Sequence, residues 1–245
     1  MKMNSIRYVV TSDCALTVVF SDEINEQVNI RVSAFADSLK QSDIKGITDI
    51  CPAYSSVMIS FDPSVISLRK LKRKAAALFR RITDDAVPAG KLWEIPVCYG
   101  GKYGEDLDET AKFLGISSGE LVKRHSGKCY RIYMLGFLPG FAYLGGLDKT
   151  IAAPRLSAPR TAIPAGSVGI GGEQTGIYPL RSPGGWRLIG TTPLDVYNPV
   201  RKQPVLYSSG DYLKFVPVSE EKFLEIKNLV SAGKYEYICG DYNGS

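Results

Sequence analysis

Residues 136–147 read GFLPGFAYLGGL, residues 154–160 read PRLSAPR, and residues 163–190 read IPAGSVGIGGEQTGIYPLRSPGGWRLIG. Glycine permits left-handed turns and close backbone approach, whereas proline fixes its neighbours in extended or turn geometry. The same composition, rich in glycine, proline and β-branched residues and without a helical period, continues from residue 128 to residue 218. It predicts short strands joined by tight turns, and therefore a β-barrel or a sandwich.

The first ninety residues instead alternate between strand-like and helix-like patterns. Strands are expected at residues 7–11, 15–20, 46–51, 56–61 and 92–99, with helices at residues 23–40 and from Ser64 towards Asp84-Asp85. The order strand, helix, strand, strand, helix, strand predicts a small ferredoxin-like α/β sandwich. A boundary near residue 90 gives an α+β chain with domains 1–90 and 91–245. The second domain adds short helices at residues 106–114, 118–125 and 220–232, and a last strand at 235–239.

Composition narrows the class of protein. With 44% hydrophobic and 22% charged residues over 245 positions, the chain can bury a substantial core. Its apolar runs fall far short of the roughly 20 residues that cross a bilayer, and its first residues lack a signal-peptide core. We therefore expect a cytoplasmic protein with no membrane partner. The five cysteines include no CxxC pair, which argues against zinc and disulfide frameworks and predicts small buried side chains.

A basic run lies between residues 69 and 81. It comprises Arg69, Lys70, Lys72, Arg73, Lys74, Arg80 and Arg81. Such a run is compatible with nucleic acid or with an acidic partner. Apolar residues recur beside it at helical spacing, which favours the solvated side of an amphipathic helix. No interleaved aromatic or zinc-finger pattern supports a nucleic-acid partner.

Five aromatic residues lie within the glycine-rich stretch and are candidate substrate-binding residues. They are Phe137, Phe141, Tyr143, Tyr178 and Trp186. Rigid loops that hold aromatic rings at fixed angles can line a pocket, but the same rings can also plug the corners of a barrel. The sequence leaves both interpretations open. Gln174 and Ser182 add neutral hydrogen-bonding groups for a substrate.

Three charged or titratable residues are candidates for catalysis. His125 is the only histidine, so a multi-histidine metal site is excluded and no metal is expected. It also ends a predicted helix, where histidine commonly complements the helix dipole. Arg155 and Arg160 each follow a proline, and arginine on a stiff loop suits capture of a carboxylate or phosphate. Surface ion pairs are the structural alternative.

No nucleotide-binding motif is apparent. The segment Gly169-Ile170-Gly171-Gly172 begins like a dinucleotide fingerprint, but Gln174 occupies the last glycine position and no helix follows. A GxxxxGK[ST] loop is also missing from the sequence.

His125, Tyr130 and the motifs GFLPGFAYL, PR, PR, IPAGSVGI, Q-T, YP, SPGGW and IG-TTP follow one another in this order. In this combination the chain resembles the allophanate hydrolase subunit 1 domain family, whose members include KipI-type kinase inhibitors and PxpB-type 5-oxoprolinase B subunits. The motifs span roughly residues 93–200, and the layout of the N-terminal part agrees, so the resemblance covers the whole chain.

The resemblance implies a cyclophilin-like β-barrel for residues 91–245. It also implies a role as the B subunit of an ATP-dependent 5-oxoprolinase, which opens 5-oxo-L-proline to L-glutamate together with a PxpA-like A subunit and a PxpC- or KipA-like C subunit. ATP would be used by the complex. At a site shared by the B and C subunits, we expect Arg155 or Arg160 to hold a carboxylate or phosphate and His125 to move protons or position water.

A KipI-like inhibitor of sensor histidine kinase autophosphorylation is the alternative that shares these motifs. Its partner would be a histidine kinase, and its barrel pocket would grip a proline-bearing segment. An amidolyase associated with urea carboxylase fits less well, because the chain lacks biotin and amidase signatures. Prolyl isomerisation is not implied, because a fold does not carry an activity with it.

Overall fold

The computed structural model describes residues 6–23, 25–82 and 90–242. The chain divides into two compact units, residues 1–88 and residues 89–245. Each unit has its own hydrophobic core.

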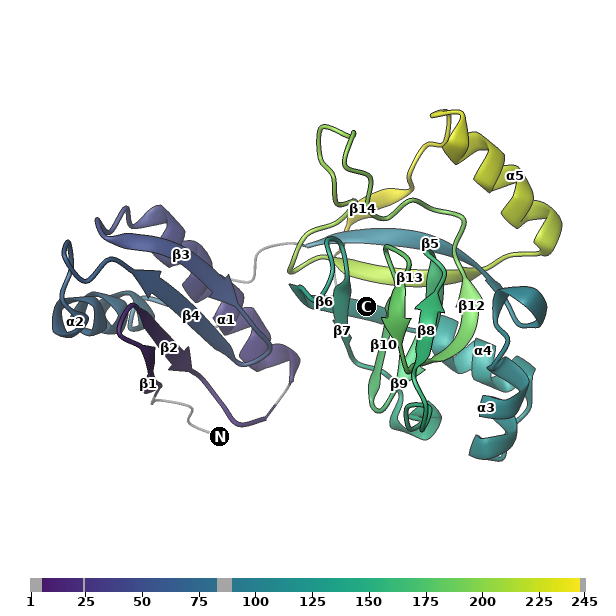
Figure 1. The fold of residues 1–245 in the computed structure, drawn as a ribbon, viewed down its shortest axis with the longest axis horizontal. Coiled ribbons are helices and arrows are strands. Elements are labelled where there is room, and N and C mark those ends of the chain that lie inside the picture. The colour runs from purple at the N-terminus through teal and green to yellow at the C-terminus, as the bar shows by residue number, and fades with distance from the viewer. Residues whose placement is uncertain (1–5, 24, 83–89, 243–245) are drawn as a thin grey trace. The chain divides into compact units, whose positions relative to one another are not determined.

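The first unit is a four-stranded sheet with two helices on one face (Figure 1). Its elements are β1 (Arg7–Ser12), β2 (Ala15–Val19), α1 (Glu26–Gln41), β3 (Ile47–Pro52), β4 (Ser56–Phe61) and α2 (Leu68–Phe79). The strand order is β1-β2-β4-β3, and every neighbouring pair is antiparallel. Buried residues alternate with half-buried ones along β4, as expected of a sheet with one face on the core.

Local signals in the sequence explain where the helices begin. The side chain of Asn25 accepts a hydrogen bond from the Val28 amide at the start of α1, and Ser67 accepts one from Lys70 at the start of α2. These caps satisfy backbone amides that have no partner within the helix. Phe20, which follows β2, meets Phe35 of α1 and Phe79 of α2 edge-on, with ring centroids 5.5 Å apart in both pairs.

The mixed α/β character of this unit is as predicted, but the ferredoxin-like order is not confirmed. That order needs a strand after the second helix to return to the sheet. In the described chain, the strand after α2 is β5 (Lys91–Tyr99), which pairs with strands of the second unit, and β1 holds the edge position beside β2. The second helix was expected to end near Asp84-Asp85, which lie outside the described residues, but α2 already ends at Phe79.

The second unit is built around a curled sheet. Its strands are β5, β6 (Cys129–Leu135), β7 (Ala142–Gly145), β8 (Arg160–Ile163), β9 (Ser167–Gly171), β10 (Gln174–Ile177), β11 (Ser182–Gly184), β12 (Arg187–Thr191), β13 (Tyr212–Pro217) and β14 (Cys239–Asp241). The order is β10-β9-β12-β5-β13-β6-β7, with β14 also paired to β5. The two ends of this order, β10 and β7, lie side by side, so the sheet forms a nearly closed barrel (Figure 1). Strands β8 and β11 pair separately.

Helices cover parts of the barrel. They are α3 (Leu107–Leu114), α4 (Ser118–Ser126) and α5 (Glu220–Ser231). Gly115 ends α3 in the left-handed conformation, as a glycine readily does, and Ser117 caps α4. The last strand is displaced from its expected position at residues 235–239 to residues 239–241.

Within the described residues, no helix has the length and apolar character needed to cross a membrane. The same residues also contain no cluster of His, Cys, Asp or Glu that could hold a metal ion. All five cysteines are free, but the expectation that they are buried is wrong for Cys14, Cys51 and Cys239, which lie on exposed strand positions or at exposed turns.

Candidate functional site

A small cavity of about 120 Å³ opens at one side of the barrel unit. Its walls come from four segments of the sequence. These are the loop before β7 together with β7 itself, the loop after the short helical turn at residues 149–151, the residue that follows β10, and the stretch from the end of β11 to the turn before β12. The lining residues are Phe137, Phe141, Tyr143, Arg155, Tyr178, Gly184, Gly185 and Trp186. We call this cavity the aromatic pocket.

Edge-to-face ring contacts fix the shape of the pocket. Phe141 lies at the centre, with its ring centroid 5.6 Å from both Tyr178 and Trp186 and 5.1 Å from Tyr143. The interplanar angles lie between 62° and 78°, the arrangement that aromatic quadrupoles favour. Phe141, Tyr178 and Trp186 are buried in a core cluster with Ile163 and Leu188. The rings therefore act both as packing for the barrel corner and as walls of the pocket.

Glycines make room for the central rings. A Cβ atom on Gly171 would lie 2.3 Å from the Trp186 indole, and one on Gly184 would lie 2.6 Å from the Tyr178 hydroxyl. A Cβ atom on Gly176 would lie 3.1 Å from the same indole. A side chain at Gly171 or Gly184 would therefore have to displace a ring, and Gly184 itself lines the pocket. Gly184 and Gly185 were not among the expected site residues, although the SPGGW motif contains them.

Phe137 stands at the rim of the pocket. It is 63% exposed, and its backbone has a φ of 65°, in the left-handed region that bulky residues rarely adopt. Its ring still meets Phe141 edge-on at 5.5 Å. Strained backbone at a cavity mouth is a pointer to function, because a packing role alone does not need it.

Arg155 supplies the positive charge of the pocket. Its guanidinium lies 6.0 Å from the centroid of the Trp186 ring, and the side chain is exposed at the rim. Among the described residues, no carboxylate forms an ion pair with it. An arginine on an aromatic wall without a counter-ion is suited to bind a carboxylate or phosphate of a ligand.

Arg160 has a different environment, although it was predicted beside Arg155. Its Nε lies 3.0 Å from Glu105 and its Nη2 lies 2.7 Å from Asp106. The hydrogen bond to Asp106 raises the pKa of Arg160, so the guanidinium stays charged. Asp106 is buried and also accepts a hydrogen bond from the Leu188 amide. This pair ties the start of α3 to β8 and β12, and it matches the structural alternative for Arg160.

His125 lies in the barrel core and does not line the pocket. It is fully buried and stacked on Phe215, with ring centroids 4.6 Å apart. Its Nδ1 lies 2.8 Å from the Tyr99 hydroxyl and its Nε2 lies 2.8 Å from Oγ1 of Thr175. The Thr175 hydroxyl donates to the Gly169 carbonyl, so it accepts from Nε2, and Nδ1 accepts from Tyr99. Burial lowers the pKa of His125 to about 3, which keeps the imidazole neutral.

The remaining two expected residues also lie outside the lining. Gln174 begins β10, where it is half-buried. Ser182 is buried on β11 opposite Ile163, and its hydroxyl has no hydrogen-bond partner within the described structure. The structure therefore brings together six of the ten predicted site residues, the five aromatic ones and Arg155.

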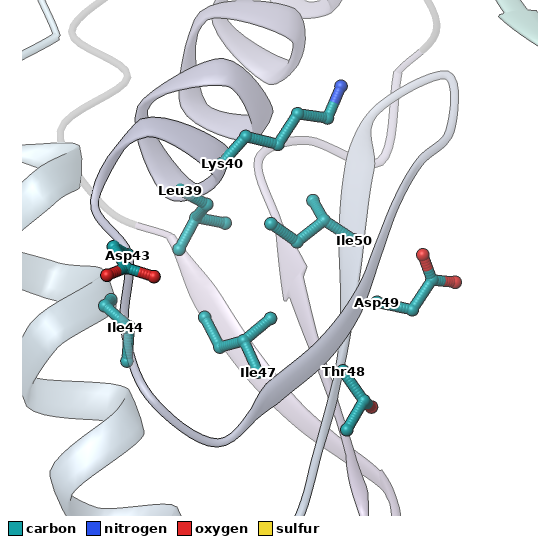
Figure 2. A pocket seen from close by; sticks show the side chains of 8 residues that line it. All are labelled: Leu39, Lys40, Asp43, Ile44, Ile47, Thr48, Asp49 and Ile50. Atoms are coloured by element: carbon teal, nitrogen blue, oxygen red, sulfur yellow. The ribbon is translucent and has the colours of Figure 1, made fainter.

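A larger cavity of about 270 Å³ lies in the first unit, between the end of α1 and strand β3. Figure 2 shows the side chains of Leu39, Ile47 and Ile50 gathered at its centre, while the charged ends of Lys40 and Asp49 lie at separate places around them. The charged groups therefore do not converge on the apolar centre of this cavity. The aromatic pocket, where charge and aromatic surface converge, is therefore the better candidate.

Comparison with known proteins supplies the family. Residues 6–207 match the family model described as carboxyltransferase domain, subdomain C and D. The chain is 43% identical to the B subunit of 5-oxoprolinase from Bacillus subtilis, over 89% of this chain and 96% of that protein. It is 40% identical to the 5-oxoprolinase B subunit of Escherichia coli O157:H7, over 73% of this chain and 81% of that protein.

A solved structure agrees with this assignment. The crystal structure of TTHA0988 superimposes with a TM-score of 0.75 and 37% sequence identity, over 84% of this chain and 40% of that chain. The likeness supports the mixed α/β architecture with its curled sheet. The chain belongs to the carboxyltransferase-domain family of subdomains C and D and, within it, to the family of 5-oxoprolinase B subunits.

Proposed function

We propose that this chain is the B subunit of a 5-oxoprolinase, which opens the lactam ring of 5-oxo-L-proline to L-glutamate in a complex with a PxpA-like and a PxpC-like partner. Relatives of similar length that are named as B subunits of 5-oxoprolinase support this proposal. The observation in the structure that carries it is the aromatic pocket with Arg155 at its rim.

The pocket fits the chemistry of the substrate. 5-Oxo-L-proline is a small five-membered ring that bears one carboxylate. Ring faces pack well on the edge-to-face walls formed by Phe141, Tyr178 and Trp186. The Arg155 guanidinium, which lacks a carboxylate partner among the described residues, would bind the substrate carboxylate through paired hydrogen bonds. In this proposal the chain orients the lactam and anchors its charge.

ATP drives the reaction in the proposed complex, because a lactam carbonyl is a poor electrophile and phosphorylation of its oxygen creates a leaving group. The residues of this chain do not fit a bound nucleotide at the glycine-rich segment. Gly169 and Gly171 lie inside β9, which is paired with β10 on one side and with β12 on the other, so this segment is sheet and not an open phosphate-binding loop. We therefore place the nucleotide on a partner protein and assign no step of phosphoryl transfer to this chain.

The rim of the pocket points to a shared site. Phe137 and Arg155 are exposed there, and Phe137 is held in a strained backbone conformation. An exposed aromatic side chain and an exposed arginine are the residue types that dominate protein–protein contacts. We propose that the PxpC-like partner covers this rim and completes the substrate site.

His125 and Arg160 have positioning roles in this proposal. A neutral, fully buried imidazole cannot exchange protons with a substrate, but its hydrogen bonds join α4 to β5 and β10. Arg160, which is bound to two carboxylates, holds β8 against α3. Both residues would act by fixing the strands on which the pocket residues stand.

The finer architecture is also a proposal. We infer a cyclophilin-like barrel for residues 91–245 and a ferredoxin-like sandwich for residues 1–90, with β1 in the place of the missing fourth strand. The closed order of the sheet and the two helices on one face of the first unit support this. The family resemblance also supports a location in the cytoplasm.

The test is ATP-dependent release of glutamate from 5-oxo-L-proline by the chain mixed with its cognate PxpA-like and PxpC-like partners, and with each component omitted in turn. Activity that depends on this chain is the expected result. Arg155→Ala should raise KM for 5-oxo-L-proline at least tenfold, and Arg155→Lys should restore part of the loss. Arg181→Ala, which changes an exposed arginine between β10 and β11, should have no effect. Equal activity without the chain would contradict the proposal.

A further inference from the structure

Helix α2 carries an exposed surface of one charge sign. Arg69, Lys70, Arg73 and Lys74 are all exposed, and we call these four residues the cationic face. Leu71 and Ala75 are buried in the core of the first unit, so the cationic face lies on the side of α2 that the core does not use. The sequence contains no Asp or Glu between residues 63 and 83.

This arrangement is unfavourable for the helix itself. Arg69 and Arg73 are four residues apart, as are Lys70 and Lys74, and like charges at this spacing repel each other. The first turn of α2 contains no acidic residue but does contain Arg69 and Lys70, which stand at the positive end of the helix dipole. By contrast, α1, α3, α4 and α5 all carry an acidic residue in their first turn.

Nothing within the described structure neutralises this charge. None of the four residues forms an ion pair with a described carboxylate, although other cations of the same unit do, such as Arg7 with Asp22 and Lys40 with Asp37. Because the like charges of this surface repel one another and destabilise the helix, an anionic partner surface would stabilise it by neutralising them. The cationic face also carries no aromatic side chain on which nucleic-acid bases could stack.

We propose that the cationic face of α2 docks against an acidic surface of another protein of the 5-oxoprolinase complex. This inference rests on the proposed function, because it takes the chain to be one member of that complex. Complementary charge of this kind accelerates association, fixes the orientation of the partners and weakens as the salt concentration rises. The aromatic pocket belongs to the other unit.

The test uses the double variant Arg69→Glu/Lys70→Glu. It turns both repulsive pairs into Glu–Arg and Glu–Lys pairs in the favourable orientation. It also places Glu three residues after the Ser67 cap, which is the pattern of a capping box. The variant should therefore melt at the same or a higher temperature than the wild type. The control is Lys45→Glu/Lys234→Glu, which changes the net charge equally at two other exposed lysines.

Binding of each protein to the purified PxpA-like and PxpC-like partners is measured by calorimetry at 50 and 300 mM NaCl, together with glutamate release. We expect Arg69→Glu/Lys70→Glu to weaken binding at least tenfold at 50 mM NaCl, the wild-type affinity to fall with salt, and the control to bind within twofold of wild type.

If the double variant is well folded and binds the partners with wild-type affinity, the inference is overturned and the proposed function stays intact. Absence of both assembly and glutamate release with the wild-type chain overturns both. The wild type could also bind a single-stranded oligonucleotide tightly. If the double variant loses that binding but still binds the partner proteins as the wild type does, the cationic face belongs to nucleic acid and the inference is overturned.

Discussion

Lowering the pH from 7.5 to 5.0 should destabilise the barrel unit through one side chain, His125. Its imidazole is fully buried, and burial lowers its pKa from 6.5 to about 3 in the folded protein. In the unfolded chain the pKa is close to 6.5. Below pH 6.5 the unfolded state therefore takes up a proton that the folded state does not. A depressed histidine pKa gives stability that is complete above pH 6.5 and is lost as the pH falls towards 3.

The size of the effect follows from this difference. Each pH unit below 6.5 removes about 1.4 kcal/mol from the free energy of unfolding, so the loss at pH 5.0 is about 2 kcal/mol. The tautomer adds to the reason for a low pKa. Nδ1 accepts a hydrogen bond from Tyr99, so a second proton has to displace that bond inside the core. The pKa values of Glu120 and Asp148 lie below their usual range, so these carboxyls stay ionised between pH 7.5 and 5.0.

Urea unfolding at pH 7.5, 6.5, 5.5 and 5.0 measures this loss in the wild type and in His125→Gln. Because His125 is the only histidine, the variant removes all imidazole titration from the chain. It should be less stable by about 1–3 kcal/mol at pH 7.5, since one buried hydroxyl loses its partner. Its stability should then change by less than about 0.5 kcal/mol down to pH 5.0. A wild type whose stability is flat over this range, or a variant that loses as much as the wild type, would refute the reasoning.

Two further substitutions test the pocket and its support. Gly171→Ala puts a methyl group 2.3 Å from the Trp186 indole and should displace the ring. It should lower the free energy of unfolding in urea by about 1–3 kcal/mol and raise KM for 5-oxo-L-proline. Gly119→Ala, with open space around its Cβ atom, should change neither quantity. Asp106→Ala leaves the Leu188 amide without its acceptor and leaves Arg160 paired with Glu105 alone, and it should cost about 2–4 kcal/mol in urea unfolding. Glu105→Ala, on the exposed side of the same arginine, should cost under about 1 kcal/mol by the same measurement.

Patterns within a short segment were predictable from the sequence, because the forces that set them act locally. The alternation along residues 56–61 predicts β4, and the apolar spacing from residue 64 onwards predicts α2. The five aromatic residues were also named from the sequence, which left open whether their rings line a pocket or plug a corner of the barrel. In the structure they line a cavity, and Phe141, Tyr178 and Trp186 also pack in a buried cluster.

Contacts between distant segments were not predictable in the same way. The side chains that bind His125 belong to Tyr99 and Thr175, which lie 26 and 50 residues away in the sequence. The Asp106 that binds Arg160 lies 54 residues away. Arg155 and Arg160 both follow a proline, and only their tertiary neighbours distinguish the arginine without a described counter-ion from the one bound to two carboxylates.

The glycines of β9 and β10 suggest one kind of site in the sequence and have another role in the structure. In the sequence, Gly169, Gly171 and Gly172 resemble part of a phosphate-binding loop. In the structure, a side chain at Gly171 would meet the Trp186 indole, and side chains at Gly169 and Gly176 would meet both Trp186 and a backbone carbonyl. The same glycines that would have suggested a nucleotide are thus needed to seat the indole that walls the aromatic pocket. Under the proposed function, the chain would hold the small ring of 5-oxo-L-proline in this pocket, and another protein of the complex would supply the phosphate chemistry.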